Sequence, residues 1–154
     1  MRSSTVNLPA IVGFASAVEI LRKEGQSENK RFLKLRDFFI DEILKKIDKT
    51  QLNGPRQQRL ANNINISFFG VEGESLMLEL DHYGIAVATG SACSSKTLEP
   101  SHVLLAIGLS PAKAHGSLRI SLGRWTKKDD LLYVVDVLKK VVKRLRKISP
   151  IYDQ

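Results

Sequence analysis

The sequence contains only one cysteine in 154 residues. A single thiol excludes an internal disulfide and any zinc site that is built from several cysteines. Its three histidines, His82, His102 and His115, also lack the paired spacing of a zinc site, so we expect no bound metal. Chains with so little cysteine are typical of reducing compartments, and the sequence therefore predicts a cytoplasmic protein.

Aromatic residues are also scarce, at 6% of the chain, although the chain is strongly basic. It carries 24 Lys and Arg against 16 Asp and Glu, which gives a formal charge of +8. Such a charge would attract a nucleic acid or an acidic protein surface. The bases do not alternate with aromatic rings as they do on single-strand stacking platforms, so the sequence does not favour nucleic-acid binding over a solvated basic face.

No apolar run approaches the length of about 20 residues that a membrane helix needs, so we expect no membrane segment. Glycine-rich phosphate loops of the Walker or dinucleotide kind are also missing, which gives a nucleotide cofactor no support. What remains is a chain with 43% apolar residues, which is enough for one ordinary hydrophobic core.

The apolar spacing predicts helices and strands in a mixed order. Helices are expected at residues 9–24, 27–48, 74–83, 101–109 and from Thr126 onward, and strands near 52 and at 63–69, 84–88 and 118–122. Gly25 should stop or bend the first helix, whose broad apolar surface predicts packing on two sides. Together these elements predict an α+β fold in which helices cover a small antiparallel sheet.

The last predicted helix accounts for much of the positive charge. Thr126 is a good N-cap residue, and Asp129 and Asp130 follow in the first turn. Six Lys and Arg residues lie toward the other end, between 139 and 147. This distribution complements the helix dipole, so part of the basic charge has a structural explanation.

Cys93 stands in a run of small polar residues, 90–95, that follows a short apolar segment. A free cysteine is more often buried, but the lack of apolar neighbours here predicts an exposed and reactive thiol. Lys96 would favour the thiolate, which is only a few per cent of an unperturbed thiol at pH 7. Small residues offer little apolar area to offset the entropy of ordering, so we expect residues 91–97 to be mobile.

Four segments of the sequence resemble one enzyme family. Residues 89–95, 98–104 and 118–124, together with Arg-Ser-Ser-Thr at 2–5, are similar to the C-terminal part of cysteine desulfurases, in the form with the longer catalytic-cysteine loop. These are pyridoxal 5′-phosphate (PLP) enzymes of aminotransferase class V. The resemblance implies the small C-terminal domain of a fold-type-I PLP enzyme. In that reading residues 1–25 bridge from a large PLP domain that this chain lacks, and residues 26–154 form the small α+β domain.

The same resemblance implies roles for individual residues. Cys93 matches the catalytic cysteine that becomes a persulfide, and Arg119 matches the arginine that binds the substrate carboxylate, a task for which the guanidinium fork is well suited. Thr5 matches a threonine that contacts the PLP phosphate across a homodimer, although Ser4 replaces the usual glycine. His115 is expected to have a structural hydrogen-bonding role. The lysine that forms the Schiff base with PLP has no match in this chain.

By resemblance, the complete protein is expected to remove sulfur from L-cysteine, giving alanine, and to pass it to an acceptor such as an iron–sulfur scaffold protein. This chain alone is expected to be inactive. Two alternatives stay open from the residues themselves. One is a basic module that binds a protein or nucleic acid, with Cys93 incidental, and the other is a cofactor-free thiol or sulfur carrier.

Overall fold

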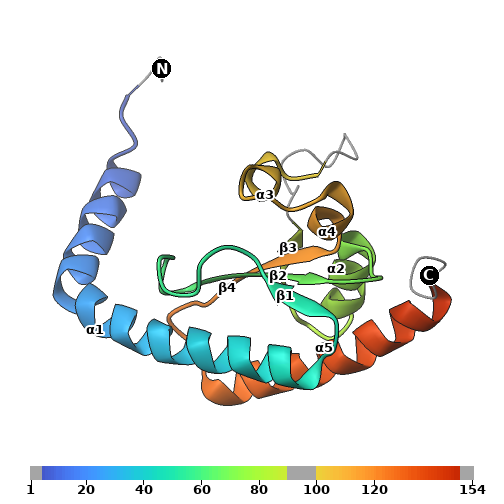
Figure 1. The fold of residues 1–154 in the computed structure, drawn as a ribbon. Helices are drawn as coiled ribbons and strands as arrows, with labels where there is room; N and C mark the ends of the chain where they lie inside the picture. Colours follow the sequence, from blue (N-terminus) through green and yellow to red (C-terminus); the bar gives the residue numbers. More distant parts are fainter. Residues whose placement is uncertain (1–4, 90–99, 150–154) are drawn as a thin grey trace.

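The computed structural model describes residues 5–89 and 100–149. Its elements, in chain order, are α1 (Leu8–Lys46), β1 (Thr50–Leu52), β2 (Asn63–Phe68), α2 (Gly73–Asp81), β3 (Ala88–Thr89), α3 (His102–Ala106), α4 (Pro111–His115), β4 (Ser117–Ser121) and α5 (Lys128–Ile148). Helices cover a small antiparallel sheet of four strands (Figure 1), so the predicted α+β class is confirmed.

The sheet has the strand order β1-β2-β4-β3, with every neighbouring pair antiparallel. Its two central strands pair so that Ile64 lies opposite Ile120 and Ile66 lies opposite Leu118. Because side chains alternate between the faces of a strand, these residues share one apolar face. The intervening positions, which include Asn65 and Arg119, form the other face.

The hydrophobic core lies between the apolar face of the sheet and three helices. In Figure 1 the C-terminal part of α1 and the whole of α5 lie along one side of the sheet, while α3 and α4 lie on the other. The fully buried side chains of the core include Phe39, Ile40 and Ile43 of α1, Leu76 and Leu80 of α2, Ile64 and Ile66 of β2, Leu118 of β4, and Val135 and Leu138 of α5. Leu104, Leu109 and Ala114 form a separate small cluster around α3 and α4.

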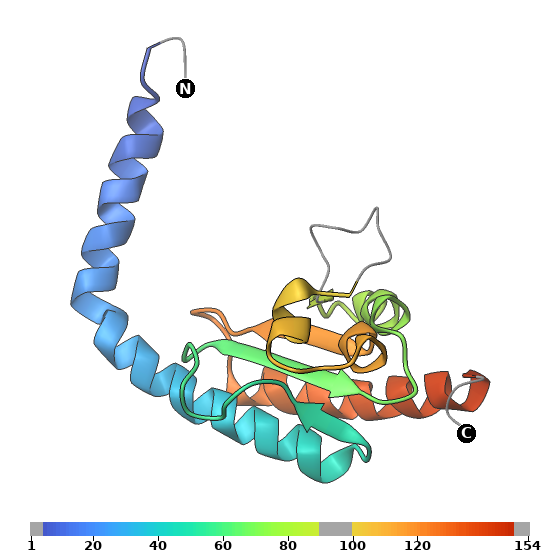
Figure 2. The same cartoon turned by 45° about the horizontal axis from the view of Figure 1, so that its top comes forward.

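Helix α1 is one continuous helix of 39 residues, where the sequence predicted two. Gly25 does not stop it, but the helix bends in the light-blue part that contains this glycine (Figure 2). Asn7 caps the beginning, because its side chain accepts a hydrogen bond from the backbone N–H of Ala10 at 3.2 Å.

The N-terminal part of α1 is exposed on all sides, so no described residue provides the packing on two sides that the sequence predicts. Ile11 is 52% exposed, Phe14 72% and Leu21 69%. Both views show this part of the helix extending away from the sheet and the other helices (Figures 1 and 2). Its apolar residues therefore have no described neighbours that could cover them.

Arginine side chains tie the bend of α1 to the turn between β4 and α5. Arg31 donates hydrogen bonds to the carbonyl oxygens of Arg124 and Thr126, each at 2.8 Å. Arg124 forms an ion pair with Glu24 on α1, so it has a structural role. The bent helix is thus held by contacts to residues about 100 positions away in the sequence.

In the same turn, the N-terminal cap of α5 differs from the predicted cap, Thr126. The helix begins at Lys128, and the backbone N–H of Lys127 donates to the carboxylate of Asp130 at 2.8 Å. Thr126 instead accepts a hydrogen bond from the backbone N–H of Gly123 at 2.9 Å. Its hydroxyl closes the turn, which leaves the acidic residue in the first helical turn to act as the cap.

Gly116 lies where two backbone segments meet tightly. A Cβ atom added there would lie 2.7 Å from the carbonyl oxygen of Phe68 and 2.8 Å from that of Val71. These are backbone atoms, which cannot move aside as the end of a long side chain can. Only glycine therefore fits between β2 and the turn that leads into α2.

We predict that Gly116→Ala lowers the free energy of unfolding by about 1–3 kcal/mol, because the added methyl group overpacks this contact. Urea unfolding followed by circular dichroism would measure the change. Gly13→Ala is the matched control, since its added Cβ meets nothing within 4 Å. Equal stability of Gly116→Ala and the parent chain would contradict the close approach.

Candidate functional site

Arg119 lies in the middle of β4, on the face of the sheet that points away from the core. Its register partners are Asn65 on β2 and Ala88 on β3, so a strand flanks it on each side. Its neighbours Leu118 and Ile120 are buried while Arg119 itself is exposed, as the alternation of apolar residues at 118–122 indicates. Its guanidinium forms no hydrogen bond or ion pair with the residues that the structure describes, and it is thus available to an anionic ligand.

A buried polar network lies on the same face of the sheet, beside the position of Arg119. The side-chain amide of Asn53 donates to the Oδ1 of Asn65 at 2.6 Å and to the Oγ of Ser67 at 2.8 Å. Ser67 in turn donates to the backbone carbonyl of Lys113 on α4 at 2.8 Å. The network therefore joins the end of β1, strand β2 and helix α4, and it fixes the strand next to Arg119.

The sequence did not predict this network, although it indicated the orientation of two of its residues. The alternation of apolar residues at 64, 66 and 68 indicates that Asn65 and Ser67 face away from the core. It gave no sign of Asn53, which is 4% exposed and comes from a loop after β1. Small polar residues that alternate along a central strand are a reason to look for a buried partner from elsewhere in the chain.

Arg59 holds the loop that carries Asn53. Its Nε donates to the carbonyl of Pro55 at 2.7 Å, and its Nη2 donates to the carbonyl of Asn53. Burial lowers the pKa of the Arg59 guanidinium from its ordinary value, and the nearby charge of Arg36 lowers it further. The side chain still donates to both carbonyls, so it acts as a clamp for the loop.

Cys93 and the loop predicted to be mobile lie outside the described residues. The structure describes the chain up to Thr89, at the end of β3, and again from Pro100. Ala88 of β3, the last described strand before Cys93 in the sequence, lies opposite Arg119 on β4.

Thr5 is not brought to Arg119 within one chain. It precedes α1, and this end of α1 lies far from the sheet in both views (Figures 1 and 2). Its side chain is exposed. Any site that uses both residues therefore needs one of them from a second copy.

The three histidines belong to three different elements: His82 follows α2, His102 begins α3 and His115 ends α4. His82 is exposed, and its Nδ1 lies 3.2 Å from the carbonyl oxygen of Leu78. His115 is also exposed, and its ring makes no hydrogen bond to a described residue, so the expected hydrogen-bonding role is wrong there. Over residues 5–89 and 100–149, no three His, Cys, Asp or Glu side chains gather as a metal site would require. Within the same ranges no helix is long and apolar enough to cross a membrane.

We predict that Asn53→Ala lowers the free energy of unfolding by about 1–3 kcal/mol, because it leaves the buried acceptor atoms of Asn65 and Ser67 without their donor. Thermal or urea unfolding would measure it. Gln51→Ala is the control, since Gln51 is an exposed residue of β1, two positions before Asn53. A loss no larger than that of the control would show that the network does not support the sheet.

Comparison with known proteins gives one family. Residues 1–134 match the family described as aminotransferase class-V. Among curated relatives, the chain is 52% identical over 149 residues to a protein named cysteine desulfurase IscS from Dictyoglomus turgidum, and 51% identical over 152 residues to cysteine desulfurase IscS 1 from Archaeoglobus fulgidus. These matches cover 97% and 99% of the chain but only 38% and 40% of the relatives. The chain therefore spans about two fifths of their length.

Two solved structures have a fold similar to that of this chain. A NifS-like protein superposes with a TM-score of 0.80 at 29% identity, over 93% of this chain and 36% of that one. A second NifS-like protein, from Rickettsia africae, superposes with a TM-score of 0.78 over 92% of this chain and 36% of that one. Its identity is 24%, so it supports the fold alone.

Proposed function

Because this chain belongs to the aminotransferase class-V family, we propose that it is the C-terminal part of a cysteine desulfurase, an enzyme that removes sulfur from L-cysteine and leaves alanine. The observation that carries the proposal is the identity of about one half to proteins named cysteine desulfurase, over nearly the whole chain. We assign residues 26–154 to the small domain and residues 1–25 to a bridge from a large PLP domain. The exposed apolar residues at the N-terminal part of α1 support this division, since they need a cover that the described chain does not supply.

In this proposal Cys93 accepts the sulfur. Its thiolate forms a new S–S bond to the substrate sulfur as the C–S bond of the substrate breaks. The electron pair of the broken bond stays with the carbon, which takes up a proton on the way to alanine, and Cys93 is left as a persulfide. The run of small residues around it supports the assignment, because an acceptor must meet the substrate and then a second protein.

Arg119 binds the carboxylate of the substrate cysteine. Three observations support this role: the side chain is exposed, it points off the core, and it has no partner among the described residues. A guanidinium donates two parallel hydrogen bonds to a carboxylate, which sets the orientation of the substrate as well as its affinity. The clamped strand next to it, held by Asn53, would keep the guanidinium in place.

PLP is the cofactor of the proposed enzyme, and the residues of this chain would form only a small part of its binding site. When bound, it supplies the carbonyl that takes up the substrate amine and the electron sink for the reaction. Thr5 has a hydroxyl suited to a phosphate oxygen, and its distance from Arg119 within one chain supports a contact across a homodimer. We assign the Schiff-base lysine to the large domain, so the isolated chain would be inactive.

The persulfide sulfur would pass to an acceptor protein, such as a scaffold for iron–sulfur cluster assembly. Persulfide chemistry needs a thiol that is not oxidised to a disulfide. The single cysteine of the chain supports a reducing setting such as the cytoplasm. A basic binding module with an incidental cysteine is less well supported, because it does not explain the match across the whole chain.

The carboxylate role can be tested in a chimera in which this chain replaces the matching 38% of the Dictyoglomus turgidum relative. Arg119→Ala should raise the KM for L-cysteine about tenfold to a hundredfold, which corresponds to about 1.5–3 kcal/mol for a lost charge-assisted contact. Arg119→Lys should recover part of the loss, because it keeps the charge but not the fork.

Ser121→Ala is the control for this experiment, since Ser121 is the next outward-facing position on β4. It should leave the KM unchanged. If Arg119→Ala also left the KM unchanged, or altered it only by unfolding the domain, the carboxylate role would be withdrawn. A chimera that binds PLP and folds but makes no alanine would count against the function as a whole.

A further inference from the structure

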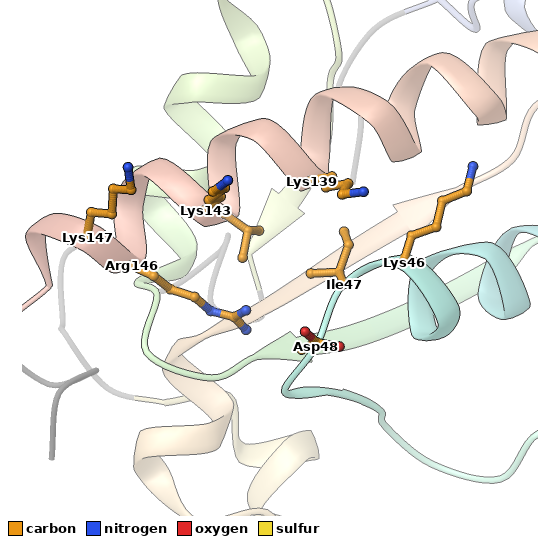
Figure 3. Close-up of a pocket in the computed structure, with 8 residues that line it drawn as sticks. Lys46, Ile47, Asp48, Lys139, Lys143, Arg146 and Lys147 are labelled. Carbon is orange, nitrogen blue, oxygen red and sulfur yellow. The ribbon is translucent and has the colours of Figure 1, made fainter.

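A concave site lies where the end of α1 meets α5. It has a volume of about 330 Å³ (Figure 3). Its lining residues are Lys46, Ile47, Asp48, Lys139, Val142, Lys143, Arg146 and Lys147. Five of the eight are cationic and one is acidic, so the cavity carries a strong positive charge that the proposed desulfurase chemistry does not use.

Three of these cations form a line along α5, which we call the lysine row: Lys139, Lys143 and Lys147. They are spaced by four residues, which places them on one face of the helix with a rise of about 6 Å per step. Figure 3 shows their side chains spread along the helix rather than converging on one point. Such an arrangement suits an elongated anionic partner better than a compact ion.

The other two cations of the cavity are already engaged. Lys46 lies 2.8 Å from Glu42, and the hydrogen bond to this carboxylate raises the pKa of the lysine. Arg146 is 8% exposed and donates to the backbone carbonyls of Phe69 and Lys49, each at 3.0 Å. Arg146 therefore joins α5 to two turns of the sheet.

The lysine row, by contrast, has no ion-pair partner within the described ranges. On another face of the same helix, Arg144 pairs with Glu79 of α2. The lysines border Asp48 in the cavity, and Asp136 on α5 is close enough to Lys46 to raise its pKa. Asp48, Asp136 and Glu42 are thus negative groups near the row. Of these, Glu42 is already paired with Lys46.

Helix capping does not explain the whole row. Cations stabilise a helix dipole within its last turn, which here contains Arg146 and Lys147. Lys139 lies more than two turns before the end of the helix. Like charges four residues apart also destabilise an isolated helix slightly, so the row carries a small cost that an anionic partner would relieve.

We propose that the lysine row and its cavity form a docking surface for an acidic segment of a partner protein. Carboxylates at every fourth residue of a helix repeat at the same rise of about 6 Å, so they can meet all three lysines. Ile47 and Val142 form the apolar part of the lining, which suits a polypeptide with an apolar side chain between its charges. Nucleic acid is the weaker fit, since the lining has no aromatic ring on which a base could stack.

A synthetic peptide tests the proposal on the chain itself. The probe is a labelled helical peptide of about 20 residues, long enough to hold a helix, with Glu at every fourth position of an Ala- and Gln-rich host. Fluorescence anisotropy at low salt should show binding that weakens as salt is added. The same peptide with Gln in place of Glu should bind at least about tenfold more weakly.

The matched variants remove equal charge from two surfaces. The triple variant Lys139→Gln, Lys143→Gln, Lys147→Gln should weaken binding of the Glu peptide about tenfold or more. The control triple Lys23→Gln, Lys30→Gln, Lys34→Gln removes three exposed lysines of α1 and should change it less than about twofold. Circular dichroism should show that both variants keep the helix content of the parent chain.

Three results would overturn the proposal. One is an equal loss of binding in both triple variants, which would show that only the net charge matters. Another is no binding of the Glu peptide even at low salt. The third result is that a duplex DNA of about 20 base pairs binds more tightly than the Glu peptide at the same salt concentration, and that only the lysine-row variant loses this DNA binding. That result would assign the surface to nucleic acid.

Discussion

The antiparallel pairing of β2 with β4 sets the two faces on which this protein depends. With Ile64 opposite Ile120, the apolar side chains of both strands meet α1, α2 and α5 and build the core. The same register puts Asn65 opposite Arg119 on the other face. A slip of one residue would bury the arginine and expose the isoleucines, so the stability of the core and the orientation of the candidate substrate-binding residue have one cause.

Part of the basic charge holds secondary structure together rather than binding partners. Arg31 donates hydrogen bonds to the turn between β4 and α5. Near the C-terminal end of α5, Arg146 donates hydrogen bonds to two turns of the sheet. A guanidinium can satisfy several carbonyls at once, which explains why arginine occupies these positions. The lysine row differs from these arginines, because its three charges have no ion-pair partner among the described residues.

The alternation of apolar residues in β2 and β4 was enough to predict the sheet and the outward direction of Arg119, since a half-buried strand has a period of two residues. It could not reveal the bond from Asn53 to Asn65, which depends on a loop from another part of the chain. The prediction of two helices in α1 failed for a similar reason. Glycine costs a helix only about 1 kcal/mol, and contacts between Arg31 and a distant turn hold the helix on the far side of Gly25.

The central claim is that Cys93 receives sulfur from L-cysteine, and mass spectrometry of the chimera with the Dictyoglomus turgidum relative tests it most directly. After incubation with PLP and L-cysteine, and without a reductant, the peptide that contains Cys93 should gain the mass of one sulfur atom, and dithiothreitol should remove it. Cys93→Ser should bind L-cysteine but gain no mass and transfer no sulfur. A chimera that makes alanine at the full rate with Cys93→Ser, or that never carries sulfur on this peptide, would contradict the account.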